Sequence, residues 1–324
     1  MMSQMNRTDE WSQQVWKYCL IGNIAEAYQL LEHEQNLSAE WQRFREDLFE
    51  RFFAGKPAFP KPPIPKKLEP LLDCYYSYLY QVLIKKIERK QAEEQLAHNL
   101  SMLLKKPGIS MEELETDIKI LFEKEGYHFL GGKTEPFYGP YIWTANEERE
   151  YEVEIPLGKQ RLKVIFMHGF VMCGWLDFAT CGQRGAGGWA KEEGLYCVFD
   201  RYKCILDSSI FEVSYLKHEA QHADDFKRFP ALKSFELEYR AKLVELINEE
   251  TPRIINQLIR DADPNPDFPH HYSSYLIVKD LEKQFGFLLS SHVADFTSEE
   301  MEKVRLAAER VFLNHTASLE KRFK

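Results

Sequence analysis

The chain has 324 residues, which is enough for one large domain or two ordinary ones. With 44% hydrophobic and 29% charged residues, a net charge of −9 and no basic stripe, it has the composition of a globular protein and not of a nucleic-acid-binding one. It contains no run of about 18 apolar residues, so we expect no membrane span.

The cysteines and the N-terminus favour a cytoplasmic protein. The six cysteines are scattered without C-x-x-C spacing, which predicts reduced thiols and argues against a cysteine zinc site. The first residues, Met1 to Trp16, are polar and lack the apolar centre of a secretory signal. We therefore expect the protein to work in the cytoplasm.

Residues 1–125 predict a helical N-terminal region. Apolar residues recur at helical spacing in three runs before residue 54. Five prolines between residues 55 and 65 then predict an extended connector, because proline does not continue a helix. One long helix is expected from about Glu69 to Leu104. Ser110-Met-Glu-Glu113 is a capping-box pattern for the next helix, Met111 to Lys124.

Residues 126–324 predict a second domain, with a small sheet followed by helices. Glu150 to Ile155 alternates polar and apolar residues, which is typical of a half-buried strand, and further strands are expected over residues 161–167 and 195–201. The glycine-rich stretch 182–188 lacks a Walker lysine and precedes a strand, so we expect a turn there and not a phosphate loop. The predicted fold class is α+β, mainly helical, with a small mixed or antiparallel sheet.

The most informative motif is His218-Glu-Ala-Gln-His222, which reads H-E-x-x-H. Residues four apart share one face of a helix, so the two imidazoles can bind one Zn²⁺. Glu219 can then act as a general base toward a water on the metal. Apolar residues on two sides of the surrounding segment predict a buried helix that ends before Pro230. A structural His-Glu-His cluster without metal is the alternative interpretation.

A catalytic zinc usually takes a third protein ligand. In the extended form of the motif a third histidine lies six residues after the second one. Here that position, six residues after His222, is Arg228. The next expected helix, about residues 232–249, offers Glu236, Glu238 and Glu245. Glu238 is favoured because apolar positions flank it. Glu236 has basic residues at helical spacing and fits a surface ion pair, while Glu245 lies two turns further along the same face and stays open as an alternative.

This arrangement resembles the gluzincins, the thermolysin-like zinc metallopeptidases. The resemblance covers roughly residues 195–246, which include a strand, the H-E-x-x-H helix and a following helix with a glutamate. It implies a zincin-like catalytic domain within residues 126–324.

The resemblance also implies roles for particular residues. His218, His222 and Glu238 correspond to the zinc ligands, and Glu219 corresponds to the general base. The edge strand before the metal helix, within residues 187–198 here, corresponds to the strand that pairs with the substrate backbone.

Hydrolysis of a peptide bond also needs a donor for the oxyanion. His270-His271-Tyr272 opens an expected helix after a proline, and we take His271 as the candidate donor. A pair of surface histidines at a helix start is the alternative. Tyr215 and Tyr239 are further candidates, although each also fits a core aromatic residue.

These observations predict a cytoplasmic zinc metallopeptidase that acts on peptide or protein substrates, without a nucleic-acid or membrane partner. The alternative is a binding or regulatory protein that keeps the zincin scaffold and its zinc but has little proteolytic activity, with the N-terminal helices as an interaction module. Glu219 favours the enzyme, because a structural zinc normally has four ligands and needs no general base.

Overall fold

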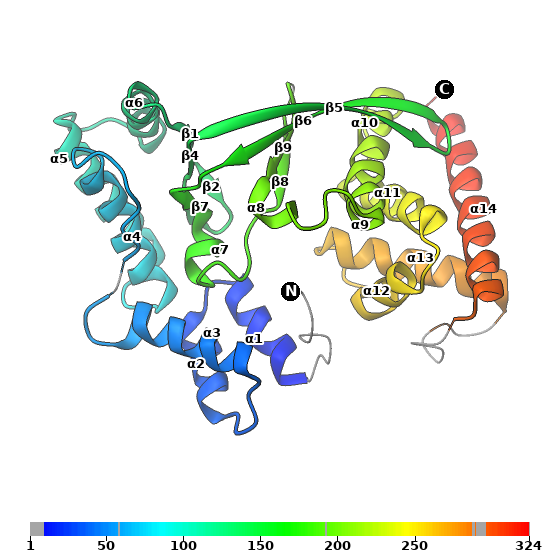
Figure 1. The fold of residues 1–324 in the computed structure, drawn as a ribbon, viewed down its shortest axis with the longest axis horizontal. Helices are drawn as coiled ribbons and strands as arrows, with labels where there is room; N and C mark the ends of the chain where they lie inside the picture. The colour runs from blue at the N-terminus through cyan, green and yellow to red at the C-terminus, as the bar shows by residue number, and fades with distance from the viewer. Residues whose placement is uncertain (1–9, 58, 192, 287–288, 290–295, 324) are drawn as a thin grey trace. The chain divides into compact units, whose positions relative to one another are not determined.

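The structure, a computed structural model, describes residues 10–57, 59–191, 193–286, 289 and 296–323. It divides the chain into two compact units (Figure 1). The first unit comprises residues 1–147, 165–189 and 196–199, and the second comprises residues 148–164, 190–195 and 200–324. Residues 1–9, which belong to the segment searched for a secretory signal, lie outside the described residues.

The N-terminal part of the first unit is helical, as predicted. Its helices are α1 (Glu10–Leu20), α2 (Ile24–His33), α3 (Ala39–Leu48), the π-helix η1 (Phe49–Phe53), α4 (Glu69–Leu83), α5 (Arg89–Leu104) and α6 (Met111–Lys124). The described residues between 55 and 65 contain no helix or strand. The capping box of α6 is confirmed: the Ser110 hydroxyl accepts from the Glu113 amide, and the Glu113 carboxylate accepts from the Ser110 amide.

The single long helix expected from Glu69 to Leu104 is wrong. Helix α4 ends at Leu83, and α5 begins at Arg89 after a turn in which Lys85 has a left-handed backbone with φ of 51°. Both helices carry an apolar stripe that is buried, and the turn lets α5 fold back against α4. A continuous helix would hold the two stripes apart in a line, so tertiary packing overrides the local helical pattern here.

Short strands and one helix complete the first unit. They are β1 (His128–Leu130), β2 (Lys133–Thr134), β3 (Phe137–Tyr138), β4 (Tyr141–Trp143), β7 (Met172–Cys173) and α7 (Gly174–Ala179). Strands β1, β4 and β7 form an antiparallel sheet in that order, and β2 pairs antiparallel with β3. Phe129, Ile142 and Trp175 share one core with Tyr75 and Leu79 of α4. The division between the compact units therefore does not fall at residue 125, where the sequence analysis put the domain boundary.

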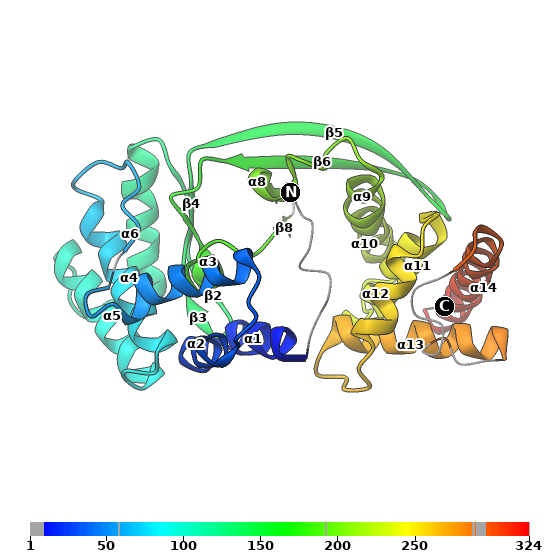
Figure 2. The same ribbon diagram turned by 60° about the horizontal axis from the view of Figure 1, so that its bottom comes forward.

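A four-stranded sheet has the order β5-β6-β9-β8, so β8 is an edge strand. Its members are β5 (Ala145–Ile155), β6 (Gly158–His168), β8 (Gly188–Lys191) and β9 (Gly194–Val198). The three predicted strands fall in β5, β6 and β9, but the last one ends at Val198 because residues from Phe199 onward form the short helix α8 (Phe199–Tyr202). The long β5–β6 hairpin is visible in both views (Figures 1 and 2).

The strands of this sheet have residues in both units, and the remaining elements of the second unit are helical. They are α9 (Ser209–Phe211), the π-helix η2 (Glu212–Lys217), α10 (His218–Arg228), α11 (Ser234–Asn248), α12 (Arg253–Asp261), α13 (Pro269–Phe285) and α14 (Ser298–Arg322). Helix α11 is central, because it packs against α10, α13 and α14 (Figure 2). The predicted α+β class with mainly helical content is confirmed. Among the described residues, no helix combines the length and the apolar character needed to cross a membrane.

Candidate metal centre

The H-E-x-x-H motif opens α10, directly after the π-helical turn η2. Short π-helical segments within longer helices often occur at functional sites, because the extra residue in the turn changes the direction of the side chains. Ala220, Gln221 and Asp225 of α10 have no exposed surface, so one face of this helix is fully buried. The structure therefore buries one side of this helix, whereas the sequence predicted burial on two sides; Phe226, on another side, is 56% exposed.

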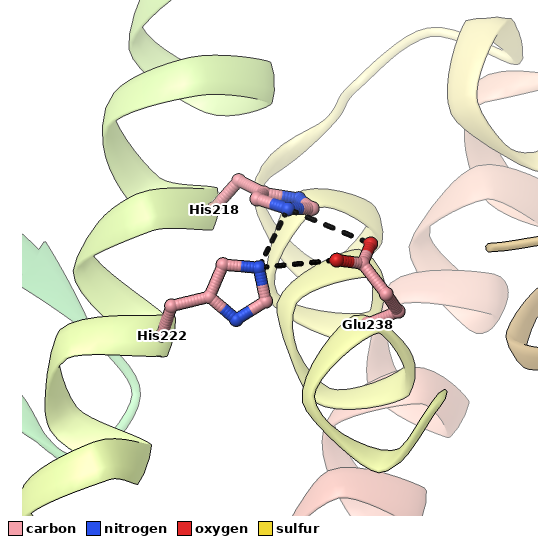
Figure 3. Close-up of side chains that lie close together, drawn as sticks. All are labelled: His218, His222 and Glu238. Atoms are coloured by element: carbon pink, nitrogen blue, oxygen red, sulfur yellow. Dashed lines mark hydrogen bonds and ion pairs between the residues drawn. The ribbon is translucent and has the colours of Figure 1, made fainter. Parts of the chain in front are cut away.

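The two histidines point toward Glu238 on the neighbouring helix α11 (Figure 3). The Nε2 atoms of His218 and His222 are 2.9 Å apart. The Glu238 carboxylate oxygens lie 3.4 Å from His222 Nε2 and 3.7 Å from His218 Nε2. One ligand atom from each residue lies within 4.8 Å of the other two. The structure thus brings together the three residues that the sequence singled out as metal ligands.

This donor set has the composition of a catalytic metal site. Two imidazole nitrogens and one carboxylate oxygen are the ligands of a common class of catalytic zinc centres, in which a fourth position is left for water or substrate. Imidazole also suits other first-row divalent metals, so these side chains could hold a divalent cation without specifying which one.

Glu245 is the carboxylate that contacts His218 on the side of the ring away from His222. Its Oε1 atom lies 2.7 Å from His218 Nδ1, the ring nitrogen that does not face His222. A carboxylate in this position fixes the tautomer and the orientation of a metal-binding imidazole. Glu236 is engaged elsewhere, because it forms an ion pair with Arg322 at 2.7 Å and accepts from the amide of Lys233 at 3.0 Å.

The electrostatics of the cluster favour an ionised carboxylate beside the histidines. Burial opposes ionisation of Glu238, but hydrogen bonds with His222 and His270 and the charge of His218 hold its pKa well below the ordinary value. Burial also opposes protonation of His218, yet its hydrogen bond with Glu245 and the nearby carboxylates raise its pKa above the ordinary value. The carboxylates stabilise a positive charge between them, which protonated imidazoles can supply. A bound divalent cation would supply the same charge.

A pocket of about 500 Å³ adjoins the cluster, and all of its lining residues belong to the second unit. Glu219, His222 and Glu238 line it together with residues of β6, β8 and β9. Within the described part of the chain, the Glu219 carboxylate forms no hydrogen bond or ion pair with another side chain. It is therefore available to a molecule in the pocket.

The two adjacent histidines that are candidate oxyanion donors, His270 and His271, have different partners. His270 Nδ1 lies 2.8 Å from Glu238 Oε2, whereas His271 Nδ1 lies 2.8 Å from the backbone carbonyl of Asp261. His270 is therefore the histidine beside the cluster, whereas His271, the predicted oxyanion donor, contacts the backbone of Asp261 instead.

The two tyrosines are also engaged. The Tyr239 hydroxyl donates to the Asp280 carboxylate at 2.8 Å, and the ring of Tyr215 stacks on Phe211 at 5.1 Å. Both have the core surroundings that the sequence analysis gave as their alternative.

Sequence reasoning missed a buried ion pair between the two helices that carry the cluster. Asp225 of α10 and Arg240 of α11 have no exposed side-chain surface, and Arg240 Nε donates to Asp225 Oδ1 at 2.7 Å. Asp225 lies three residues after His222, and Arg240 two residues after Glu238, so this pair joins the two helices next to the candidate ligands. Local spacing instead suggested Arg240 as a partner of Glu236 and Asp225 as a partner of a ligand histidine, because the two residues are 15 positions apart on different helices.

Comparison of the chain with protein-family models, with curated proteins and with solved structures found no match.

Proposed function

We propose that the protein is a zinc-dependent metallopeptidase with its centre at His218, His222 and Glu238. The observation that carries the proposal is the convergence of these three side chains from facing helices, with the free Glu219 carboxylate in the adjoining pocket. A site that only held a structural metal would normally be closed by a fourth protein ligand.

Three further features support this function. The donor set of two histidines and a glutamate is that of catalytic zinc sites, and Glu245 supports His218 from the far side of its ring. The edge strand β8 contributes Ala190 and Lys191 to the same pocket, so a backbone edge adjoins the centre.

The proposed mechanism assigns a task to each side chain. When bound, Zn²⁺ would acidify a coordinated water and polarise the substrate carbonyl. Glu219 accepts the proton of the attacking water and delivers it to the leaving amine. Glu245 keeps the His218 ring in one orientation through Nδ1. His270, beside Glu238, is the nearest of the predicted histidines to donate a hydrogen bond to the oxyanion.

The proposal is tested by separating metal binding from cleavage. Zinc is measured by elemental analysis in wild type, Glu219→Gln and His218→Ala, and cleavage is followed by mass spectrometry on a mixed peptide library. Glu309→Gln, which changes an exposed glutamate of α14 far along the chain from the motif, is the matched control. We expect Glu219→Gln to keep its zinc and lose cleavage by a factor of about 10² or more, since it removes the general base.

Two results would contradict the proposal. If zinc-loaded wild type cleaves no peptide, the binding or regulatory alternative is favoured. If His218→Ala contains as much zinc as wild type, the cluster is not the metal site.

A further inference from the structure

The pocket beside the cluster has a positive wall, although the chain as a whole carries a net charge of −9. Four cationic side chains line the pocket: Arg161, Lys163, Lys191 and Lys227. Three carboxylates also line the pocket. Glu219 and Glu238 have roles in the proposed function, and the third is Glu193.

Two of these cations, Arg161 and Lys227, form no ion pair with a carboxylate of a described residue, although the charge of Arg161 helps to lower the pKa of Glu152. Lys163 forms an ion pair with Glu148 at 2.7 Å. By contrast, Lys227 Nζ donates to the neutral amide of Gln160 at 2.8 Å, and no carboxylate of a described residue lies within ion-pair distance of it. The Arg161 guanidinium has no hydrogen-bond or ion-pair partner among the described residues, and both side chains are exposed.

The two cations belong to different elements that meet at this pocket. Arg161 is on β6 and Lys227 is on α10, the helix of the H-E-x-x-H motif. The Lys227–Gln160 bond joins α10 directly to the strand that carries Arg161. Phe226, which is 56% exposed, adds an apolar surface one turn after His222. A ligand here meets positive charge, an apolar wall and the candidate centre within one pocket.

We infer that this pocket selects peptides that present a carboxylate close to the scissile bond. The inference rests on the proposed function and names its substrate class. A guanidinium binds a carboxylate through two parallel hydrogen bonds, and an ammonium adds a second positive charge. The carboxylate comes either from an aspartate or glutamate side chain or from the free C-terminus of the substrate, because both present the same group.

The test measures binding without cleavage, in the zinc-loaded Glu219→Gln protein. The probes are hexapeptides with an uncharged fluorophore, built as matched pairs that differ only in Asp against Asn, or only in a C-terminal acid against an amide. Affinities are measured by fluorescence anisotropy at two salt concentrations. We expect the acid member of at least one pair to bind about three- to tenfold more tightly, with a smaller preference at high salt.

Substitution of Arg161 and Lys227 tests whether the preference for acid peptides arises in this pocket. Adding Arg161→Gln and Lys227→Gln should bring the acid-to-amide affinity ratio toward one. Arg310→Gln and Lys303→Gln, at exposed positions of α14 outside the pocket, should leave the ratio unchanged. The pair that shows the preference identifies its source as a side chain or a C-terminus.

Equal affinities for acid and amide peptides would overturn the inference, and so would a preference that survives in the double variant. Neither result depends on catalysis, so the inference can fail while the peptidase proposal stands. Conversely, a carboxylate preference in a protein whose wild type cleaves nothing would support the binding site and refute the peptidase.

Discussion

Replacing Arg240 with methionine should strongly destabilise the second unit. The Arg240 side chain has no exposed surface, donates to Asp225 at 2.7 Å and to Thr316 at 3.0 Å, and lies 4.4 Å from the ring centroid of Phe312. Methionine keeps much of the aliphatic volume but leaves the Asp225 carboxylate buried without its cation. Breaking a buried pair in this way costs about 3–5 kcal/mol of unfolding free energy.

The cost should also depend on pH. Burial raises the pKa of Asp225 above its ordinary value even though Arg240 is beside it. In Arg240→Met that opposing charge is gone, so the pKa should rise further. A carboxyl whose folded-state pKa is raised stabilises the fold at low pH and loses this contribution as the pH rises. The difference between the variant and wild type should therefore shrink as the pH is lowered.

The two units can be followed by different signals during urea unfolding. The tryptophans all belong to the first unit: Trp11, Trp16, Trp41, Trp143, Trp175 and Trp189. Fluorescence therefore reports the first unit, while far-UV circular dichroism reports the helices of both. For a urea slope of about 2 kcal/mol per molar, the second unit's transition should move by about 2 M to lower urea.

The control and the rescue define what would refute this reasoning. Arg310→Met, at an exposed position of α14, should change stability by no more than about 0.5 kcal/mol. Combining Arg240→Met with Asp225→Leu removes both charges and should recover part of the loss. If Arg240→Met costs no more than Arg310→Met, the buried pair does not hold α10 and α11 together.

Two other predictions concern the support of the metal site and the response to acid. Glu245→Gln should weaken zinc binding by about 10- to 100-fold in competition with a chromophoric chelator, whereas Glu236→Gln should not; equal effects would contradict the role given to Glu245. Burial and the charge of Arg240 lower the pKa of His315 to about 4. The folded protein therefore binds fewer protons here than the unfolded chain, so chelator-treated wild type should lose about 1–2 kcal/mol between pH 7 and pH 5. The same urea titrations on His315→Gln should show a smaller loss, and an equal loss would assign it to other groups.

The local parts of the site could be predicted from the sequence because they depend on spacing within one helix. Residues four apart in an α-helix share a face, so the placement of His218 beside His222 follows from the motif itself. The capping box at Ser110 is local in the same sense. The proximity of Glu238 was also predicted, from its apolar neighbours on the next helix and from the resemblance to gluzincins.

Other features depend on contacts between distant segments. Whether His270 or His271 reaches Glu238 depends on how α13 packs on α11, and one residue along a helix changes the direction of a side chain by about 100°. The break between α4 and α5 has a similar cause, because burial of two apolar stripes outweighs the helical preference of the residues between them.

Local sequence patterns were therefore enough to predict an H-E-x-x-H helix, a following helix with glutamates, and a mainly helical α+β chain. Which of these side chains contact one another depends on the packing of distant segments. This packing put Glu245 behind His218, paired Asp225 with Arg240, and set Arg161 in the same pocket as Glu219. The physical reason is that helical periodicity is encoded over a few residues, whereas packing and charge pairing depend on segments that the chain brings together only when it folds.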